Sequence, residues 1–216
     1  MKSYQQYCSV ARALDVVGDR WVLLIVRELL ALGPSRYSDL KRGLPGIASN
    51  LLAERLRSMQ ADGLIDSFEA PAPVGTSLYQ LTANGRDLEA VVRALSRWGL
   101  GTMPSGPSER DAVQPQWSAL FAGLNLSGNL PAGGELVVAI DSGGGSVRVL
   151  LRSDGFRIDR AVADGADVML RGDARLIGAV LSGGLTPTEA TDLGLTITGR
   201  ADQLADLVSN SSPRMD

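Results

Sequence analysis

The sequence contains no histidine and a single cysteine, Cys8, among its 216 residues. Without histidine, the chain lacks the usual base of hydrolase triads and the commonest protein ligand of metals. It also lacks a paired-carboxylate motif, a phosphate loop and a dinucleotide fingerprint, since the glycines at 143–145 are not followed by a helix and indicate a turn. We therefore expect no enzyme, no metal site and no cofactor.

A long hydrophobic run is also missing. The longest candidate, residues 21–26, ends at Arg27 and Glu28 and is far shorter than the roughly 18 residues of a membrane span. Residues 1–7 are polar, unlike a signal peptide, and a lone cysteine cannot form an internal disulfide. These features predict a cytoplasmic protein with no membrane partner.

Neither half of the chain carries a strong charge. Residues 1–100 hold 12 Lys and Arg against 10 Asp and Glu, whereas residues 101–216 hold 9 against 14. Hydrophobic residues make up 44% of the sequence, which is enough for a core in each of two domains. The composition indicates a globular chain with a slightly basic first half and an acidic second half.

Residues 44–63 contain an amphipathic helical pattern. Leu52, Leu56 and Met59 follow one another at i, i+4 and i+7, which places them on one face of a helix. The residues off this apolar stripe include Ser49, Asn50, Ala53, Glu54 and Arg57. One face is therefore expected to pack while the other faces outward.

The ends of this helix and the segment before it predict a helix-turn-helix. Ser49 is the expected N-cap, and Gly63 supplies the residue without a Cβ that commonly ends a helix. A shorter helical pattern at 37–43 precedes it, joined through a Leu-Pro-Gly turn at 44–46. In such a pair the second helix enters the major groove of DNA.

A hairpin pattern follows the helix pair. Residues 64–68 and 78–82 have the composition of strands, and residues 70–77 form a loop that contains Pro and Gly. An amphipathic helix after a turn is on its own an ordinary packing element. Two helices followed by a hairpin, however, are typical of a winged helix, and we favour that interpretation.

Further helical patterns flank this module at 7–17, 20–32 and 83–98, the last with Thr82 as its expected N-cap. Large apolar residues recur at helical spacing along the last of them: Leu88, Val91, Val92, Leu95 and Trp98. A winged-helix domain on its own has few further elements that could pack against this apolar face. Either a second domain or a second subunit must do so.

Short matches to one family are spread in order along the first hundred residues, at 8–15, 18–21, 25–29, 36–40, 46–47, Leu52, 55–56, 62–65, 79–82 and Gly85. Together they resemble the HxlR family of bacterial winged-helix transcriptional regulators, over about residues 7–99. The resemblance implies a homodimer, formed through the first and last helices, on a palindromic or near-palindromic operator. Two departures are Ala48, where the family usually has Ser, and a wing without Lys or Arg between Asp66 and Leu81.

The expected DNA contacts follow from this arrangement. We assign base contacts to Ser49, Asn50, Ala53, Glu54 and Arg57, and phosphate contacts to Arg36, Lys41 and Arg42. Asn50 can form a bidentate pair with adenine, and Arg57 can reach guanine or a phosphate. The alternative for every basic residue is a solvated face. Arg55 can instead be structural, paired with a carboxylate such as Asp39.

Cys8 has two interpretations. Some HxlR relatives carry a thiol at this position that senses oxidants or electrophiles, so the resemblance implies a possible redox site. A cysteine in the first helix is also an ordinary small core residue. No Lys lies beside it in sequence to lower its pKa, and the nearest cation is Arg12, four residues on. We favour the structural interpretation.

The second half has a different pattern. Residues 101–116 are rich in Gly, Pro and Ser and indicate a linker, and residues 209–216 form a polar tail that we expect to be disordered. Between them we expect helices at 116–126, 174–182, 186–192 and 200–208 and strands at 135–141, 146–152, 156–161, 167–171 and 195–199. Hairpin turns are expected at 142–145 and 153–155.

The strand, helix, strand, helix order over 166–207 resembles the sterol carrier protein type two family, and the resemblance extends over about residues 117–208. It implies a curved sheet and helices that enclose an apolar tunnel for lipid-like molecules. The candidate lining is Trp117, Phe121, Phe156, Ile158, Leu170, Ile177, Val180, Leu181, Leu185 and Ile197. The alternative for each of these residues is ordinary core packing.

We therefore predict an α+β protein with a winged-helix DNA-binding and dimerisation domain at 1–100, a linker at 101–116, a sterol-carrier-like domain at 117–208 and a tail at 209–216. The expected function is a DNA-binding transcriptional regulator, such as a repressor, that acts as a homodimer on double-stranded DNA. An apolar small molecule in the second domain could regulate it. The alternative is a lipid-binding or protein-interaction module in which the winged helix is a scaffold without DNA binding.

Overall fold

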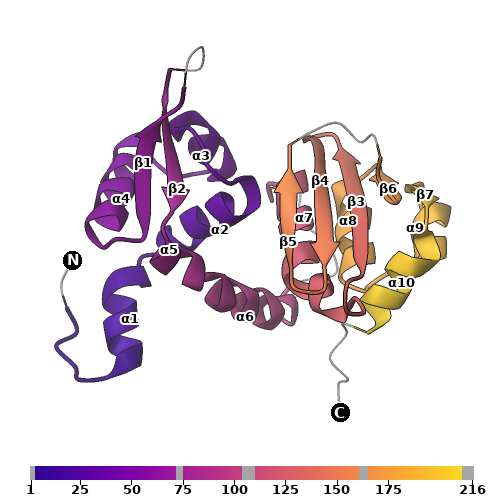
Figure 1. Cartoon of the computed structure of the whole chain (residues 1–216), viewed down its shortest axis with the longest axis horizontal. Helices are drawn as coiled ribbons and strands as arrows, with labels where there is room; N and C mark the ends of the chain where they lie inside the picture. The colour runs from indigo at the N-terminus through magenta and orange to yellow at the C-terminus, as the bar shows by residue number, and fades with distance from the viewer. Residues whose placement is uncertain (1–2, 72–74, 104–109, 161–164, 211–216) are drawn as a thin grey trace. The chain divides into compact units, whose positions relative to one another are not determined.

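The computed structural model describes residues 3–71, 75–103, 110–160 and 165–210. It combines helices with a two-stranded and a five-stranded sheet (Figure 1), which confirms the expected mixture of helix and sheet. The chain divides into two compact units, Met1–Ala94 and Leu95–Asp216. Among the described residues, no helix is both long and apolar enough to cross a bilayer.

The first unit has the element order of a winged helix. Its helices are α1 (Ser9–Val17), α2 (Val22–Leu32), α3 (Tyr37–Gly43), α4 (Ser49–Ala61) and α5 (Ala83–Asp87), and its strands are β1 (Ile65–Glu69) and β2 (Ser77–Leu81). The two strands pair antiparallel, with Ile65 opposite Leu81. Ser35 extends this small sheet, since it exchanges two backbone hydrogen bonds with Tyr79, at 2.9 and 2.8 Å.

The core of the first unit lies under α3 and α4. The side chains of Leu52, Leu56 and Met59, which form the expected apolar stripe, are all at most 2% exposed. Ile25 of α2 and Leu40 of α3 are fully buried as well. The buried face of α4 therefore fixes which of its side chains face solvent.

Two expectations for this unit are wrong in detail. Ser49 is not the N-cap of α4: Ala48 has the extended backbone of an N-cap, and its carbonyl accepts the first helical hydrogen bond from Leu52 at 2.9 Å. The single helix expected over 83–98 is two helices, α5 and α6 (Glu89–Leu100), which meet at Leu88.

The break follows from how α5 meets the wing. Thr82 caps α5 as expected, accepting a hydrogen bond from the backbone of Gly85 at 3.0 Å. Gly85 lies so close to the Leu64 carbonyl that a Cβ there would be 2.0 Å from its oxygen. The chain is thus held against Leu64, the residue before β1, for one short helix that ends at Leu88.

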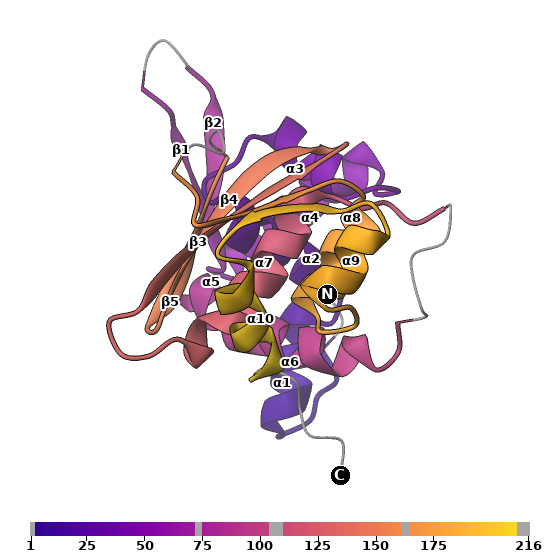
Figure 2. The same cartoon turned by 90° about the vertical axis from the view of Figure 1, so that its right-hand side faces the viewer.

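The second unit contains a five-stranded sheet in the order β5-β4-β3-β6-β7, in which only β3 and β6 are parallel neighbours. Its strands are β3 (Glu135–Ser142), β4 (Gly145–Arg152), β5 (Gly155–Asp159), β6 (Val168–Arg171) and β7 (Thr196–Gly199). Its helices are α7 (Pro115–Leu126), the 3-10 turn Ser127–Asn129, α8 (Ala174–Leu181), α9 (Pro187–Asp192) and α10 (Ala201–Ser209). Figure 2 shows α7 and α8 on one face of the sheet.

Most of the element expectations for this unit are confirmed, but Pro115 and Gln116, expected in the linker, belong to α7. The turn between β3 and β4 consists of Gly143 and Gly144, as expected for a tight hairpin. Thr186 and Glu189 form a capping box at the start of α9, with bonds of 2.8 and 3.2 Å. Ser209, which was expected in the tail, is the last residue of α10. Ala161, the expected end of the strand 156–161, and residues 211–216 of the expected tail lie outside the described residues.

The close packing of α7 on the sheet makes a stability prediction. A Cβ at Gly123 would lie 2.4 Å from the ring of Phe156, whereas a Cβ at Gly178 in α8 would meet nothing within 4 Å. We expect Gly123→Ala to destabilise the protein by about 1–3 kcal/mol through overpacking. Gly178→Ala should be neutral or stabilising by up to about 1 kcal/mol, because alanine favours helix.

Urea unfolding of both variants beside the wild type measures this difference. Equal midpoints for the two alanine variants would contradict the packing of Phe156 against Gly123.

Candidate nucleic-acid interface

The outward face of α4 carries the residues expected to read bases. Ser49, Asn50, Glu54 and Arg57 are exposed, and Ala53 is half-buried. They lie opposite Leu52, Leu56 and Met59, which are buried, so the expected division of this helix into two faces is confirmed. α4 thus presents amide, hydroxyl, carboxylate and guanidinium groups to solvent, which are the groups that read base edges in a major groove.

Two hydrogen bonds connect α3 to the turn that follows it and to the start of α4. The Tyr37 hydroxyl donates to the Ser49 carbonyl at 2.7 Å, and the Lys41 ammonium donates to the Ile47 carbonyl. Leu44 and Ile47 of the same turn are both at most 2% exposed. Tyr37 was not among the expected site residues, although it lies in the quoted match at 36–40, and a hydroxyl that bonds a backbone carbonyl leaves no signature in the sequence.

An ion pair between a buried carboxylate and a half-buried arginine holds the other end of α3. Glu28 is fully buried and lies 2.7 Å from the guanidinium of Arg27, which also donates to the Gly43 carbonyl at 3.1 Å. A Cβ at Gly43 would be 2.1 Å from a Glu28 carboxylate oxygen, so a larger residue there would force the buried Glu28 side chain to move. Because breaking a buried pair leaves a charge without its partner, this contact is costly to disturb.

The basic residues of the site have different surroundings. Arg36, Arg42 and Arg57 are all exposed. Of these, Arg42 has a carboxylate nearby, since its guanidinium lies 3.4 Å from Asp39 of the same helix. Arg55 is structural, but its partner is not Asp39: it lies 3.3 Å from Asp19 in the turn before α2. Asp39 already faces Arg42, which is three residues along α3, so the suggested pairing with Arg55 is wrong.

The wing is anionic in its described part. Asp66 and Glu69 on β1 are exposed, and Phe68 between them is 39% exposed. Glu69 accepts a hydrogen bond from the Ser77 hydroxyl at 2.6 Å. Lys and Arg are absent from residues 66–81 of the sequence. This wing therefore offers no attraction to phosphate groups.

The first and last helices of the winged helix carry exposed apolar side chains. On α1 these are Val10 and Leu14, and on α6 they are Val91, Leu95 and Trp98, with Trp98 73% exposed. Cys8, at the N-cap of α1, is exposed too. An exposed thiol does not fit the interpretation of Cys8 as a core residue, which is therefore wrong for the single chain.

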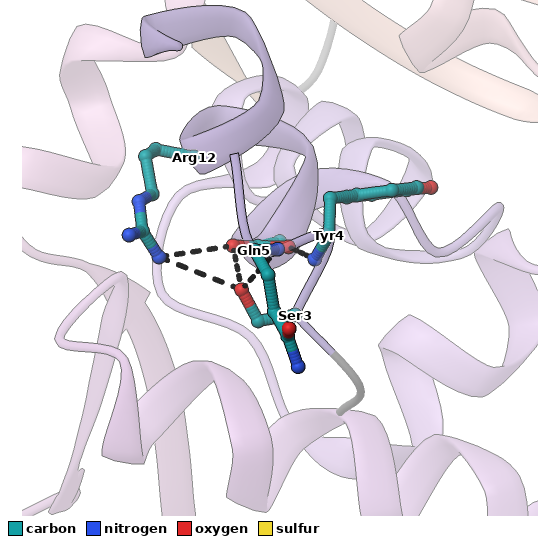
Figure 3. Close-up of polar contacts among 5 residues, drawn as sticks. Ser3, Tyr4, Gln5 and Arg12 are labelled. Carbon is teal, nitrogen blue, oxygen red and sulfur yellow. Dashed lines mark hydrogen bonds and ion pairs between the residues drawn. The ribbon is translucent and has the colours of Figure 1, made fainter. Parts of the chain in front are cut away.

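The segment before α1 is bound to that helix by polar contacts (Figure 3). The carboxylate of Asp15 accepts hydrogen bonds from the Tyr4 backbone at 2.8 Å and from the Ser3 hydroxyl at 2.7 Å. These hydrogen bonds, the Tyr4 bond foremost, lower the pKa of Asp15 below its ordinary value of 3.8. Arg12 lies 3.6 Å away and adds to the effect.

The residues expected to line a tunnel belong to the core of the second unit. Leu170, Ile177, Val180 and Leu181 are at most 1% exposed. Phe121, Phe156, Ile158, Leu185 and Ile197 are partly buried and pack against the same core, and Trp117 is half-buried. The sheet and helices thus bring these side chains together, in the way that core packing alone also would.

The helix pair, the hairpin and the exposed face of α4 define a winged helix-turn-helix protein. A family model described as HxlR-like helix-turn-helix matches residues 16–106. Among the relatives, YvaP and YtcD of Bacillus subtilis, both named HTH-type transcriptional regulators, are 32% and 34% identical to this chain. The alignments span 40% and 46% of this chain and 80% and 78% of those proteins. The chain therefore belongs, through its N-terminal part, to the HxlR-like helix-turn-helix family.

A mycobacterial relative has a higher sequence identity over a smaller share of its length. Rv3095 of Mycobacterium tuberculosis, also named an HTH-type transcriptional regulator, is 42% identical over 96 residues, which is 44% of this chain. The match spans 60% of the length of that relative. The matched family model ends at residue 106, before α7 begins.

The contacts of Asp15 predict a pH-dependent N-terminal segment. A carboxylate whose pKa is lowered by folding contributes stability above its unfolded pKa, and that contribution is lost as the pH falls through its folded pKa. We expect the NMR shift of the Tyr4 amide to follow a titration midpoint below 3.8. Asp15→Asn should abolish this titration, whereas Asp87→Asn, at an exposed position in α5, should leave it unchanged. A midpoint at or above 3.8 would rule out the lowered pKa.

Proposed function

We propose that this chain is a DNA-binding transcriptional regulator whose helix α4 enters the major groove. The observation that carries the proposal is the division of α4, with three apolar side chains buried and Ser49, Asn50, Glu54 and Arg57 exposed. Membership of the HxlR-like helix-turn-helix family and the names of the matched relatives support it. The function follows from a site of suitable geometry and not from the fold alone.

Within this interface, the exposed residues divide by role. Asn50 and Arg57, with Ser49, Ala53 and Glu54 around them, contact base edges, while Arg36, which is exposed ahead of α3, contacts a phosphate. The charge of Arg42 is partly offset by Asp39, so Arg42 contributes less than Arg36 to the attraction for phosphate. With so few cations, we expect modest affinity that depends on salt and on two copies binding together.

We propose that the second copy docks on α1 and α6. The exposed Val10 and Leu14 on α1 and Val91, Leu95 and Trp98 on α6 are apolar faces that one chain leaves in water. A twofold dimer would bury them and set two α4 helices about one DNA turn apart, to suit a palindromic operator. An exposed Cys8 at the start of α1 is placed where oxidation could affect such a dimer.

For the second unit we propose a sterol-carrier-like domain that binds an apolar small molecule. The order of β6, α8, β7 and α10 supports this proposal, as does the apolar packing between α7 and the sheet. Such a ligand would regulate DNA binding only if it bound two conformations of the protein unequally. Ligand saturation that leaves the operator affinity unchanged would exclude this coupling.

A second candidate function has one observation in its favour. The anionic wing with its exposed Phe68 suits a protein partner better than a phosphate backbone. In that case the winged helix would be an interaction platform without DNA binding. The two functions differ in their response to salt, because only phosphate contacts release counterions in proportion to their number.

Fluorescence anisotropy with DNA from the region upstream of the gene, beside a scrambled control, tests the proposal. We expect binding of the full chain that is selective for the upstream DNA and weakens as salt is raised. Binding of neither DNA at low salt would exclude the regulator and favour the interaction platform.

Two substitutions separate base reading from phosphate contact. Asn50→Ala should reduce the preference for the operator over scrambled DNA by about 1–3 kcal/mol, because Asn50 pairs with a base edge. Arg36→Ala should weaken both DNAs alike and lower the slope of log affinity against log salt by about 0.9. Anisotropy at several salt concentrations measures both quantities. Identical effects of the two substitutions would contradict this division of roles.

The anionic wing predicts a gain of affinity on charge reversal. Glu69→Lys should strengthen binding of operator and scrambled DNA alike and steepen the salt dependence by about 0.9, the value for one added phosphate contact. Glu69→Gln is the matched control: it keeps an acceptor for Ser77 and removes only the repulsion, so its gain should be smaller. If Glu69→Lys changes neither affinity nor slope, the wing lies away from DNA.

A further inference from the structure

Lys41 was expected to contact a phosphate, but its ammonium group is hydrogen-bonded to a backbone carbonyl of the same chain. It donates to the carbonyl of Ile47, the residue before the N-cap of α4. Lys41 is half-buried, unlike Arg36, which is exposed. A charged donor held on a backbone carbonyl makes a stronger bond than a neutral one does, and it must give that bond up to reach a phosphate.

Tyr37 makes the parallel contact one turn earlier in α3. Its hydroxyl donates to the Ser49 carbonyl at 2.7 Å, and Ser49 is the first residue of α4. The phenol of Tyr37 carries no positive charge, so this side chain, unlike that of Lys41, adds no electrostatic attraction to DNA. Two side chains of α3, four residues apart on one face, thus hold the two carbonyls that flank Ala48.

These bonds act on α4 because α3 is itself fixed. Arg27 donates to the Gly43 carbonyl at 3.1 Å, and the fully buried Glu28 lies against Gly43. Gly46 supplies the positive φ of 86° that the turn requires. With the C-terminus of α3 held on α2, the contacts of Lys41 and Tyr37 connect this fixed helix to the first turn of α4.

We propose that Lys41 and Tyr37 are positioning residues, which set the first turn of α4 so that Ser49 and Asn50 meet the base edges. In this region Arg36, and not Lys41, then makes the phosphate contact. The proposal rests on the proposed function in so far as α4 reads DNA, but the positioning itself is a property of the free protein. It can therefore be tested both with DNA and without it.

The DNA experiment compares Lys41→Met, Lys41→Gln and Tyr37→Phe with Arg36→Gln. Lys41→Met and Tyr37→Phe should each lower the operator affinity, by about tenfold for Lys41→Met on the scale of one charge-assisted hydrogen bond. Scrambled DNA should be affected much less, and the salt slope should not change. Lys41→Gln keeps a neutral donor and should restore most of the affinity lost in Lys41→Met.

Arg36→Gln is the matched control for loss of a phosphate contact. It should weaken both DNAs alike and lower the salt slope by about 0.9. If Lys41→Met and Lys41→Gln both behave like Arg36→Gln, then Lys41 is a phosphate contact and the proposal is wrong. Thermal unfolding of each variant checks that the comparison concerns folded proteins.

Amide hydrogen exchange of the free protein decides the matter even if the chain binds no DNA. Lys41→Met and Tyr37→Phe should speed exchange in the first turn of α4, at Leu52 and Ala53, and leave exchange at the helix end near Met59 unchanged. Lys41→Gln should resemble the wild type. Unchanged exchange at Leu52 in both Lys41→Met and Tyr37→Phe would overturn the positioning role. Absence of DNA binding by the wild type would instead overturn the proposed function alone.

Discussion

The burial of one face of α4 is the constraint on which the candidate interface depends. Leu52, Leu56 and Met59 are buried in the core of the first unit, so the helix cannot rotate without exposing them. At about 1.5–3 kcal/mol for each large apolar side chain removed from water, this fixes the outward direction of Asn50 and Arg57. Hydrogen bonds from α3 then refine a position that hydrophobic packing has already chosen.

The sequence predicted this packing well, because helical periodicity and turn residues are local signals. It did not predict the contacts that depend on three-dimensional neighbours. Arg55 was expected to be structural, yet its partner Asp19 lies in a distant turn that spacing cannot identify. Likewise, Lys41 and Arg36 are both exposed cations by pattern, and only the structure distinguishes the one that bonds Ile47 from the one that faces solvent.

In the second unit, the alternation of apolar residues located every strand, but it could not order them in the sheet. The parallel pairing of β3 with β6 joins residues about 30 positions apart, such as Val138 and Val168. Nor does alternation distinguish a core residue from a ligand contact, since both are apolar and face inward. Phe156 illustrates the limit: its ring fills the space left by Gly123, which is a packing role that no periodicity reveals.

Hydrogen–deuterium exchange of the full chain with and without its operator would test the central claim most directly. DNA bound through α4 should slow exchange of the backbone amides from Arg36 to Arg57. Exchange in the strand Ile65–Glu69 should be the same with and without DNA, because this wing has no cation to hold a phosphate. Protection confined to residues beyond 114, or to the wing alone, would contradict the account.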